Sequence, residues 1–334
     1  MSIKLLYVER KPFESVSIEK AFKQIAACLS DEFQTEFQQA PYGNQIWDTL
    51  RNLLFFRPGD ADIYHLTGQI HYLALRLPRP NSVLSIMDVR FLYRPPGARR
   101  WALKKLYLDW PVRRMRYITA ISQQTKDEIV KFTGCDPDKV TVLDLPLAVR
   151  IDENGPKRFN AEKPSILQVG TMENKNIPNL AKALKGLSCR LRVIGKLSVV
   201  QQKALEENAV EFDAVHDLTD GQLRDEYRAA DIVAFCSTFE GFGLPIIEAQ
   251  AMRKPVVTSD LSPMRETSGR AACLVDPHHP VSIRRGLQKV IEDGSYRSKL
   301  IEDGLKNIER FKPSVVARQY ENYYRSIIDE IRPV

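Results

Sequence analysis

The sequence predicts an α/β protein built from two Rossmann-like, doubly wound domains that face a cleft. Short apolar runs alternate with longer helix-like segments along the chain, which is the pattern of βαβ units. This alternation starts twice, and a polar stretch broken by Gly-Pro separates the two series at residues 148–163. A chain of 334 residues is long enough for two domains, each with its own hydrophobic core.

The first series predicts an N-terminal domain over residues 1–150. Its strand candidates are Ile3–Val8, Asp62–Leu66, Ser82–Met87, Tyr117–Ser122 and Val140–Leu145. Between the last two, "SQQTKDEIVKFTG" begins with a serine cap at Ser122 and ends at Gly134. A capping serine and a terminating glycine predict a helix between them.

The second series predicts a C-terminal domain over residues 160–312. Its strand candidates are Ser165–Gly170, Arg190–Gly195, Val210–Phe212, Asp231–Cys236, Pro255–Asp260 and Ala272–Pro277. In open sheets of this kind, ligands bind beyond the carboxyl ends of the strands. Functional residues are therefore expected just after these runs.

The composition indicates a soluble protein, with 43% hydrophobic and 27% charged residues. No apolar run approaches the ~20 residues that span a bilayer, and the opening "MSIKLLYVER" predicts a strand and not a cleavable signal. The five cysteines lack the spacing of metal sites: Cys28, Cys135, Cys189, Cys236 and Cys273. We expect small buried hydrophobes in a reducing cytoplasm.

One loop has the features of an anion site. In "STFEGFGLPIIEAQAM" the glycines Gly241 and Gly243 permit positive φ, and Pro245 suits the first position of a helix. The N–H groups near Gly243 and Leu244 would then point outward from the positive end of a helix dipole. A phosphate or a diphosphate is the natural occupant.

Two glutamates flank this loop, and like charges prevent them from binding phosphate themselves. Glu240 precedes the predicted helix and Glu248 lies about one turn inside it. They can accept hydrogen bonds from hydroxyls of the same ligand, on opposite sides of its phosphates. A nucleotide sugar carries such hydroxyls on its hexose and its ribose. The alternative is two surface acids near a helix start, which the dipole alone would favour.

The segment from Glu240 to Glu248, with "KPVVTSD" after it, resembles the EX7E motif of retaining glycosyltransferases of family four, which have the GT-B fold. The resemblance is strong from about Ser165 to Phe311. Three further segments resemble parts of the family pattern: Leu167–Leu184, its donor loop; His216–Ser237, which leads to the EX7E motif; and Glu266–Pro277, which follows it.

The resemblance implies a retaining hexosyltransferase with no cofactor beyond its nucleotide-sugar donor. Lys175 takes the second position of the family's basic pair, which neutralises the leaving diphosphate. Asn174 takes the first position, which leaves one cation missing. Three residues are candidates to replace it: Arg253, Lys254 and Lys196.

By the same resemblance, Glu240 should contact sugar hydroxyls and stabilise charge near the anomeric carbon, while Glu248 should hold the ribose. The two are not expected to act as an acid/base couple, unlike the paired carboxylates of hydrolases. The rest of the expected donor site comprises Gly170, Thr171, Gly195, Lys196, Asp217, Leu218, Gly241, Phe242, Gly243 and Leu244.

The N-terminal half departs from the family pattern. Asp88 stands where a His-Asp pair is usual and is a candidate to orient the acceptor or the sugar, but Met87 replaces the histidine. The usual Gly-Gly after the first strand is missing from "PFESVSIEK", where Ser15 and Ser17 offer hydroxyls instead. These departures keep open a catalytically silent binding subunit. A nucleotide-sugar epimerase of the same architecture is a further alternative.

Histidines and acids elsewhere do not predict a metal site. His65 and His71 lie near a strand end, where a structural role is favoured over one in the cleft. Asp60–Asp62 predicts a turn before a strand and not a metal-binding DxD motif. His278–His279 lacks a third ligand at suitable spacing and is expected in solvent.

The net charge of +7 is concentrated in Arg90–Arg116, where Trp101, Tyr107 and Trp110 stand among the cations. This composition is typical of a segment that rests on an anionic membrane, although a solvated face is the alternative. No recognisable nucleic-acid module accompanies it. The nine basic residues are Arg90, Arg94, Arg99, Arg100, Lys104, Lys105, Arg113, Arg114 and Arg116.

The sequence therefore predicts a GT-B enzyme that moves a hexose from a nucleotide diphosphate sugar to a glycan or lipid-linked glycan. GDP-mannose is favoured weakly over a UDP-sugar because of "VGTMENKNI". The expected place is the cytoplasm or the inner face of the cell membrane. By resemblance, a C-terminal helix of about residues 313–331 would pack back on the acceptor-binding first domain.

Overall fold

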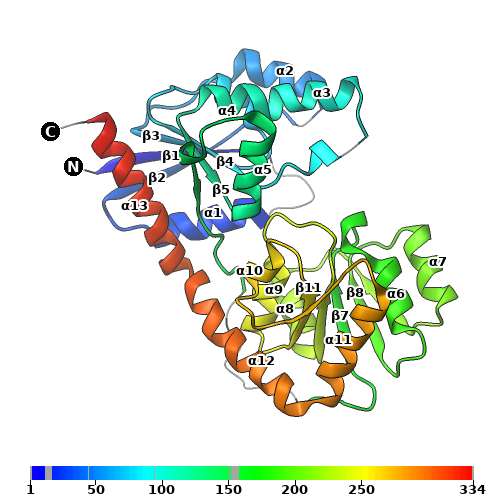
Figure 1. The fold of residues 1–334 in the computed structure, drawn as a ribbon. Coiled ribbons are helices and arrows are strands. Elements are labelled where there is room, and N and C mark those ends of the chain that lie inside the picture. Colours follow the sequence, from blue (N-terminus) through cyan, green and yellow to red (C-terminus); the bar gives the residue numbers. More distant parts are fainter. Residues whose placement is uncertain are drawn as a thin grey trace. The chain divides into compact units, whose positions relative to one another are not determined.

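The computed structural model describes residues 2–11, 17–43, 45–93, 95–149, 151 and 158–332. Their contacts divide the chain into two compact units (Figure 1). Unit 1 comprises Met1–Pro146 and Lys312–Val334, and unit 2 comprises Leu147–Phe311. Among the residues that the structure describes, no helix combines the length and apolarity that crossing a membrane requires.

Unit 1 is built on a parallel six-stranded sheet with the order β2-β1-β3-β4-β5-β6. Its strands are β1 (Ile3–Glu9), β2 (Phe33–Gln39), β3 (Ile63–Leu66), β4 (Ser82–Ile86), β5 (Tyr117–Ala120) and β6 (Val140–Val142). The strand order reverses between β1 and β3, which makes the sheet doubly wound.

The helices of unit 1 cover both faces of this sheet. One face packs Leu6, Tyr64, Leu84 and Ile118 into a core, and the alternate residues of the same strands point to the other face. The helices are α1 (Ser17–Cys28), α2 (Ile46–Phe55), η1 (His71–Leu75), η2 (Arg90–Tyr93), α3 (Ala98–Lys104), the π-helix η3 (Lys105–Asp109), α4 (Trp110–Arg114), α5 (Gln123–Thr133), η4 (Pro137–Lys139) and α13 (Pro313–Ile331).

Unit 2 is built on a second parallel sheet, with the order β12-β11-β10-β7-β8-β9. Its strands are β7 (Ser165–Val169), β8 (Arg190–Ile194), β9 (Phe212–Val215), β10 (Ile232–Phe235), β11 (Val256–Ser259) and β12 (Cys273–Val275). The order reverses between β7 and β10, so the topological switch point of unit 2 lies between these two strands.

Alternation along the strands of unit 2 produces two cores, one on each face of the sheet. Ile166 and Ile232 belong to one core, while the next residues, Leu167 and Val233, belong to the other. The covering helices are η5 (Glu173–Lys175), α6 (Ile177–Leu184), α7 (Val199–Glu207), α8 (Asp220–Ala229), α9 (Leu244–Ala251), α10 (Met264–Thr267), α11 (Pro280–Glu292), α12 (Gly294–Asn307) and η6 (Ile308–Phe311).

The last helix, α13, belongs to unit 1. Its Tyr320 and Tyr324 are fully buried beside Phe22 and His65. The Tyr324 hydroxyl lies 2.6 Å from His65 Nδ1 and 3.2 Å from the Tyr7 hydroxyl. The final helix of the chain thus supplies part of the core on which the first strand rests.

The cysteines agree with the sequence prediction only in part. All five are free thiols. Cys189, Cys236 and Cys273 are buried, but Cys28 is exposed and Cys135 is half-buried, so the expectation of a buried side chain is wrong for these two. Cys28 is the last residue of α1 and faces solvent there.

Candidate active site

The candidate site lies at the carboxyl edge of the unit 2 sheet, around the switch point between β7 and β10. The loop after β7 supplies Lys175, and the loop after β10 supplies Glu240. Lys175 Nζ lies 2.6 Å from Glu240 Oε1, and each side chain is only 13% exposed. Two residues far apart in the sequence therefore meet at the edge where such sheets bind ligands.

The environment of Lys175 holds its ammonium group in place. Nζ lies 4.4 Å from the centre of the Phe235 ring, on the last residue of β10, so the aromatic face supports the positive charge. The backbone at Gly170 has φ 87°, and a Cβ there would lie 2.8 Å from Lys175 Cε. Only glycine leaves room for this lysine to reach across the switch point.

Asn174 replaces a cation in the expected basic pair and has a different task. Its Nδ2 donates to the Phe239 carbonyl at 2.7 Å and to Glu240 Oε1 at 3.1 Å. Its own carbonyl accepts from Thr238 N at 2.8 Å. The side chain is buried, and its Oδ1 has no hydrogen-bond partner among the described residues. Asn174 thus fixes the loop that carries Glu240 instead of adding positive charge.

Two of the three candidates for the missing cation are wrong. Arg253 and Lys254 come just before β11 and therefore lie at the amino edge of the sheet. Lys254 is buried there, and its Nζ donates to the Arg228 carbonyl, just ahead of β10. Lys196 follows β8 at the carboxyl edge and is exposed, so it keeps its place as a candidate.

The loops after β8 and β9 complete this edge. Gly195 N donates to the Val215 carbonyl at 2.7 Å, and a Cβ at Gly195 would lie 2.8 Å from Thr171 Oγ1. Asp217 has φ 57° and is exposed, with His216 Nδ1 2.6 Å from its Oδ2. Leu218 beside it is half-buried. These residues share the edge with Lys175 but make no direct bond to it in the described part of the chain.

The start of α9 has the geometry of an anion site, with two corrections. Gly243 has φ 101° and precedes the helix, and its N–H and that of Leu244 come too early to have an acceptor inside the helix. Pro245 occupies the second helical position instead of the expected first. The positive φ is found at Gly243 and not at Gly241.

Phe242 is part of the core, which differs from its expected place against a ligand. Its side chain is buried and its ring centre lies 5.6 Å from that of Phe311. The Phe242 carbonyl accepts from Thr267 Oγ1 at 2.8 Å. Any contact of Phe242 with a ligand is therefore left to its backbone.

Glu248 is a buried carboxyl with one hydrogen bond in the described part of the chain. The Tyr227 hydroxyl, at the end of α8, donates to its Oε2 at 2.7 Å. Burial raises the pKa of Glu248, while the Tyr227 bond and the charge of Lys175 lower it in part. Lys175 thus influences both glutamates. Tyr227 lies within the segment that resembles the family, but no sequence signal pointed to its bond with Glu248.

The expected residues of unit 1 are mostly structural. Asp88 Oδ1 accepts from Arg90 N at 2.9 Å in the turn after β4, and Met87 beside it is buried. His65 is fully buried, with Nε2 2.7 Å from Ser85 Oγ, as the structural interpretation predicted. Ser15 lies outside the described residues, and so does the side chain of Ser17.

His71 differs from His65 because only one of its two ring nitrogens has a hydrogen-bond partner among the described residues. Its Nδ1 lies 2.8 Å from the Tyr107 carbonyl, but its buried Nε2 has no partner among the described residues. Burial lowers the pKa of His71, and the charge of Asp88 raises it in part. Asp88 and His71 are therefore electrostatic neighbours after β4 and β3, a pairing that the sequence did not predict.

Two further acids that sequence reasoning missed stand at the switch point of unit 1. Glu9 ends β1 and accepts from Gln39 Nε2 at 3.0 Å, and Glu19 in α1 pairs with Arg10 at 2.6 Å. Both carboxyls are buried, and each has one oxygen without a partner in the described residues. The same residues contain no cluster of three or more His, Cys, Asp or Glu side chains able to hold a metal ion.

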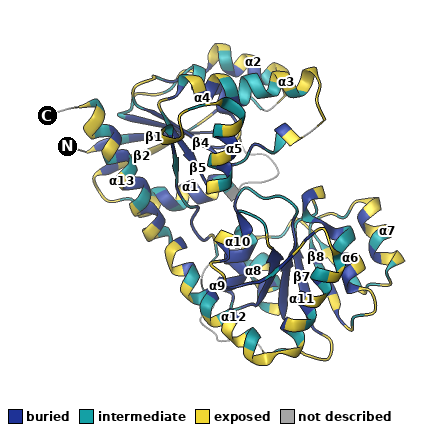
Figure 2. Cartoon of the chain, viewed as in Figure 1, coloured by how far each residue is buried: buried dark blue, intermediate teal, exposed yellow. Residues whose placement is uncertain are grey.

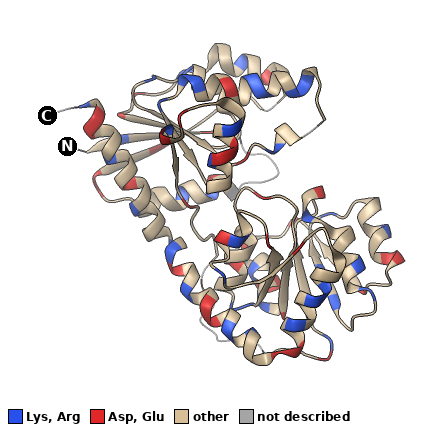
Figure 3. Ribbon diagram, in the orientation of Figure 1, with Lys and Arg blue, Asp and Glu red and all other residues tan. Residues whose placement is uncertain are grey.

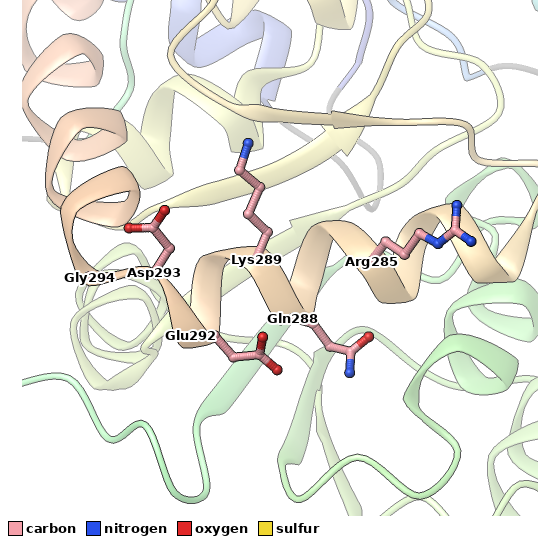
Figure 4. A pocket seen from close by; sticks show the side chains of 6 residues that line it. All are labelled: Arg285, Gln288, Lys289, Glu292, Asp293 and Gly294. Carbon is pink, nitrogen blue, oxygen red and sulfur yellow. The ribbon is translucent and has the colours of Figure 1, made fainter.

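Hollows elsewhere on the surface do not coincide with this edge. Figure 4 shows one of about 570 Å³ along the carboxyl half of α11. Because α11 starts at the carboxyl edge, just after β12, its other end approaches the amino edge. The side chains that line it carry mixed charges and are those of Arg285, Gln288, Lys289, Glu292 and Asp293, with Gly294.

Ion pairs and backbone hydrogen bonds engage several cations of the basic segment Arg90–Arg116, whose described lysines and arginines are blue in Figure 3. Lys105 pairs with Asp109 at 2.8 Å, and Lys104 pairs with the same carboxylate. Arg114 donates to two backbone carbonyls, and Arg116 pairs with Glu330. Arg94 lies outside the described residues. Much of this charge therefore supports the fold.

The loops of this edge lie within a segment that matches a known family model. Residues 149–307, which hold Lys175, Glu240 and Glu248, match the model of the family described as glycosyl transferases group 1. The crystal structure of Anabaena HepE in complex with UDP-glucose superposes with a TM-score of 0.74 at 16% identity, over 97% of this chain and 100% of that one. The fold is GT-B.

Two curated relatives extend the similarity beyond that domain. O-antigen chain mannosyltransferase B of Escherichia coli is 26% identical over 287 residues, which cover 79% of this chain and 74% of the relative. O-antigen chain mannosyltransferase RfbU of Salmonella typhimurium is 24% identical over 73% of this chain and 64% of the relative. Together these matches support a glycosyltransferase.

Proposed function

We propose that this protein is a retaining hexosyltransferase that uses a nucleotide diphosphate sugar and a glycan or lipid-linked glycan acceptor. The observation that carries the proposal is the Lys175–Glu240 pair at the switch point of unit 2. Beside it lies the amino end of α9, which favours anions. An amine, a carboxylate and a helix start at one edge match the phosphates and hydroxyls of such a donor.

Lys175 is proposed to change partners when the donor binds. In the structure its charge is balanced by Glu240 at 2.6 Å. A diphosphate brings two negative charges to the same amine and to the N–H groups before α9, so it competes with Glu240 for Lys175. Glu240 is then released to accept hydrogen bonds from the sugar hydroxyls, while Asn174 still holds its loop. The pair thus couples phosphate binding to sugar binding.

Glu248 is proposed to accept hydrogen bonds from the ribose, with Tyr227 fixing its orientation. The loops with Gly170, Thr171, Gly195 and Lys196 would border the nucleotide, and Asp217 and Leu218 would face its base. These residues stand on one edge of one sheet. Their shared position supports a single extended ligand with its diphosphate at the switch point.

The proposed reaction occurs on one face of the sugar. The bond from the anomeric carbon to the phosphate oxygen breaks, and the acceptor oxygen bonds to the same carbon from the same side. The acceptor proton passes to the leaving phosphate, so the products are a glycoside and a nucleoside diphosphate. Lys175 stabilises the charge that develops on that phosphate, and Glu240 stabilises the positive charge near the anomeric carbon. Asp88 is proposed to orient the acceptor hydroxyl.

Mannose from GDP-mannose is our first proposal for the donor. It rests on the donor-loop sequence and on two relatives whose names describe O-antigen mannosyltransferases. A UDP-sugar is the second candidate because the HepE structure contains UDP-glucose. We place the enzyme on the cytoplasmic side of the membrane, where a lipid-linked glycan and a nucleotide sugar would meet.

The test combines nucleotide binding with product analysis. Thermal stabilisation is measured with GDP, UDP, GDP-mannose and UDP-glucose, and products are identified by NMR with the configuration of the new bond. A ligand at 100 times its dissociation constant should add about 2.7 kcal/mol of stability. We expect one nucleotide family to stabilise the protein and the product to keep the configuration of the donor.

Variants decide whether the described pair is responsible. Lys175→Gln should weaken nucleotide binding, and Glu240→Gln should leave nucleotide binding but reduce turnover at least about 100-fold. Lys182→Ala, at an exposed position of α6, is the matched control and should behave as wild type. Stabilisation without turnover would favour a silent binding subunit, and a changed sugar nucleotide without acceptor would favour an epimerase. An inverted product would refute retention.

A further inference from the structure

Helix α2 of unit 1 carries most of its apolar side chains on the outside, while Leu53 packs against the core. Five of its large apolar residues are between 47% and 76% exposed: Ile46, Trp47, Leu50, Leu54 and Phe55. The spacing of residues 46, 50 and 54 places them along one stripe of a helix, with 47 and 55 adjacent to it. Figure 2 shows exposed residues along this helix. An isolated exposed apolar residue is ordinary, but a contiguous stripe marks an interaction surface.

Polar residues fix α2 in this inverted orientation. Its buried face holds Asn52, whose Nδ2 donates to the Tyr72 hydroxyl at 2.9 Å and to the Tyr42 carbonyl at 3.2 Å. Tyr42 N in turn donates to Asn52 Oδ1 at 3.1 Å. Thr49 is buried beside it and donates to the Gln45 carbonyl. Turning the helix to bury its stripe would break these buried bonds, so the apolar face is kept outward.

The inner side of α2 is connected through η1 to the aromatic part of the basic segment. η1 packs against α2, α4 and the π-helix η3. The rings of Tyr72 in η1 and Tyr107 in η3 lie 5.4 Å apart. Trp101 in α3 and Trp110 in α4 are also exposed. We call α2 together with α3 and α4 the aromatic face.

Cations border the aromatic face without carboxylate partners. Arg51 and Arg57 lie on and just after α2, and Arg99 and Arg113 are exposed on α3 and α4. In the described part of the chain none of these four guanidinium groups forms an ion pair with a carboxylate. On α2 itself the single acid, Asp48, is engaged by the backbone N–H of Gln45.

We propose that the aromatic face docks on the surface of an anionic lipid bilayer, with the α2 stripe entering the headgroup region. Apolar side chains flanked by these cations are complementary to acyl chains beneath anionic headgroups, whereas a second copy of this face would oppose like charges. The inference deepens the proposed function, because it would bring the enzyme to a lipid-linked acceptor. It differs from the sequence prediction in making α2, not the basic segment, the apolar element.

The chain offers a direct spectroscopic probe. Its three tryptophans are Trp47, Trp101 and Trp110, and all three stand exposed on the aromatic face. Their fluorescence therefore reports on this face alone. The full chain is mixed, without donor or acceptor, with vesicles of phosphatidylcholine or of phosphatidylcholine with phosphatidylglycerol. We expect a blue shift and co-sedimentation with the anionic vesicles, both reduced by salt.

Matched variants test whether vesicle binding depends on the aromatic face or on any exposed apolar residues. Leu50→Ser with Leu54→Ser should weaken vesicle binding at least tenfold, and Arg51→Gln with Arg57→Gln should remove much of its salt dependence. The control is Val199→Ser with Val200→Ser, which changes two exposed apolar residues of α7 in unit 2 and should bind as wild type. Circular dichroism and nucleotide-induced stabilisation confirm that each variant is folded.

Three outcomes would overturn the proposal. They are no binding to anionic vesicles, equal binding to neutral vesicles at high salt, and equal loss in the α7 control. Self-association of the wild type in sedimentation velocity, abolished by the α2 variant and without vesicle binding, would assign the face to a second copy. The vesicle experiment contains no donor, so absence of vesicle binding would not refute the proposed transferase activity. Absence of transferase activity would likewise not refute vesicle binding.

Discussion

Glu248 is the residue at which stability and the proposed activity oppose each other. Its carboxyl is buried, and the Tyr227 hydroxyl is its one hydrogen-bond donor in the described part of the chain. Burial raises its pKa because the charged form loses solvation. A ribose pair of hydroxyls would supply the donors that this carboxylate lacks. The buried charge of Glu248 therefore lowers the stability of the free protein, and donor binding is expected to relieve this destabilisation.

The first prediction is that Glu248→Gln stabilises the free protein at neutral pH and weakens donor binding. In the wild type the folded state holds the proton of Glu248 more tightly than the unfolded state. Stability is therefore lost as pH rises from the ordinary pKa of 4.5 to the raised folded pKa. The loss is about 1.4 kcal/mol for each pH unit that separates these two pKa values. Gln250→Ala is unsuitable as a control, because the side-chain amide of Gln250 donates hydrogen bonds to two backbone carbonyls.

Urea unfolding at pH 4 and pH 8 measures this difference, with nucleotide titrations beside it. The variant should equal the wild type near pH 4, exceed it at pH 8 and bind the donor about tenfold more weakly. Tyr227→Phe serves as the comparison, because it keeps the charge and removes its hydrogen bond, and it should be less stable at pH 8. An unchanged difference between the two pH values would contradict the burial argument.

At the residue scale the sequence indicated which residue types matter but not how they contact each other. Lys175 and Glu240 were singled out separately, for phosphate and for sugar, and the ion pair between them depends on loops that meet only in the folded sheet. Asn174 stands where the resemblance predicts a cation, whereas its amide braces the Glu240 loop. Such tertiary hydrogen bonds leave no local sequence pattern. The functional roles of these residues remain predictions.

At the element scale the predictions succeeded where local signals were strong. Helix α5 begins after Ser122, whose side chain accepts from Thr125 N, and ends at Gly134 with φ 68°. Strand β2 was missed because "FQTEFQQ" is an edge strand with only Phe33 buried, so its polar residues gave no apolar run. The predicted strand Val210–Phe212 is found at Phe212–Val215, where pairing with β8 sets the register.

The orientation of helix α2 could not be predicted from its sequence. Its apolar residues suggest a helix that faces the core, but the structure places its polar Thr49 and Asn52 inward. Periodicity identifies the two faces of a helix but cannot state which one is buried. That choice depends on Tyr42 and Tyr72, which hold Asn52 by tertiary bonds.

The docking of α13 on β3 leads to a prediction about acid. His65 lies between Tyr324 and Ser85, and burial lowers its pKa to about 3 from 6.5. Between these two values the unfolded state binds a proton that the folded state excludes. Stability contributed by His65 is therefore complete above pH 6.5 and is lost as pH falls toward 3, by at most about 1.4 kcal/mol per pH unit.

His65→Gln should remove this part of the acid dependence. At pH 7 the variant should be less stable than wild type by about 1–3 kcal/mol, because its amide fits the two hydrogen bonds less well. The gap should narrow as pH falls from 6.5. Tyr324→Phe, which keeps the buried imidazole, should retain the steep slope while losing stability at every pH. Parallel curves for His65→Gln and wild type in urea unfolding would rule out this assignment.

At the scale of the whole molecule, the chain path distinguishes the two units. Unit 2 is one continuous segment, Leu147–Phe311, and the Leu147 N–H donates to the Phe311 carbonyl at 2.8 Å where the chain enters and leaves. Unit 1 is formed by two segments, because α13 returns to it after unit 2 is complete. The two doubly wound domains were predictable from two βαβ series, whereas the GT-B fold and this return of the chain rested on the resemblance.

We therefore predict that the units differ in whether they fold alone. A fragment of residues 147–311 contains both faces of its sheet with their cores and should fold cooperatively. It should also retain nucleotide-induced stabilisation, since Lys175, Glu240 and Glu248 all lie within it. A fragment of residues 1–146 lacks Tyr320 and Tyr324, which are fully buried against Phe22 and His65 in the intact chain. Losing such buried aromatic residues costs about 3–5 kcal/mol each, which is comparable to the whole stability of a domain.

Circular dichroism and thermal unfolding of three polypeptides measure this: residues 147–311, residues 1–146, and residues 1–146 joined to 312–334 by a flexible linker. The second should lack a cooperative transition, and the third should recover one, because the linker replaces only the path through unit 2. In the joined polypeptide, replacing Tyr320 and Tyr324 by serine should abolish the recovery, which assigns it to the buried rings. If residues 1–146 unfold as cooperatively as the joined polypeptide, unit 1 does not require α13 to fold, and residues 1–146 form a complete domain.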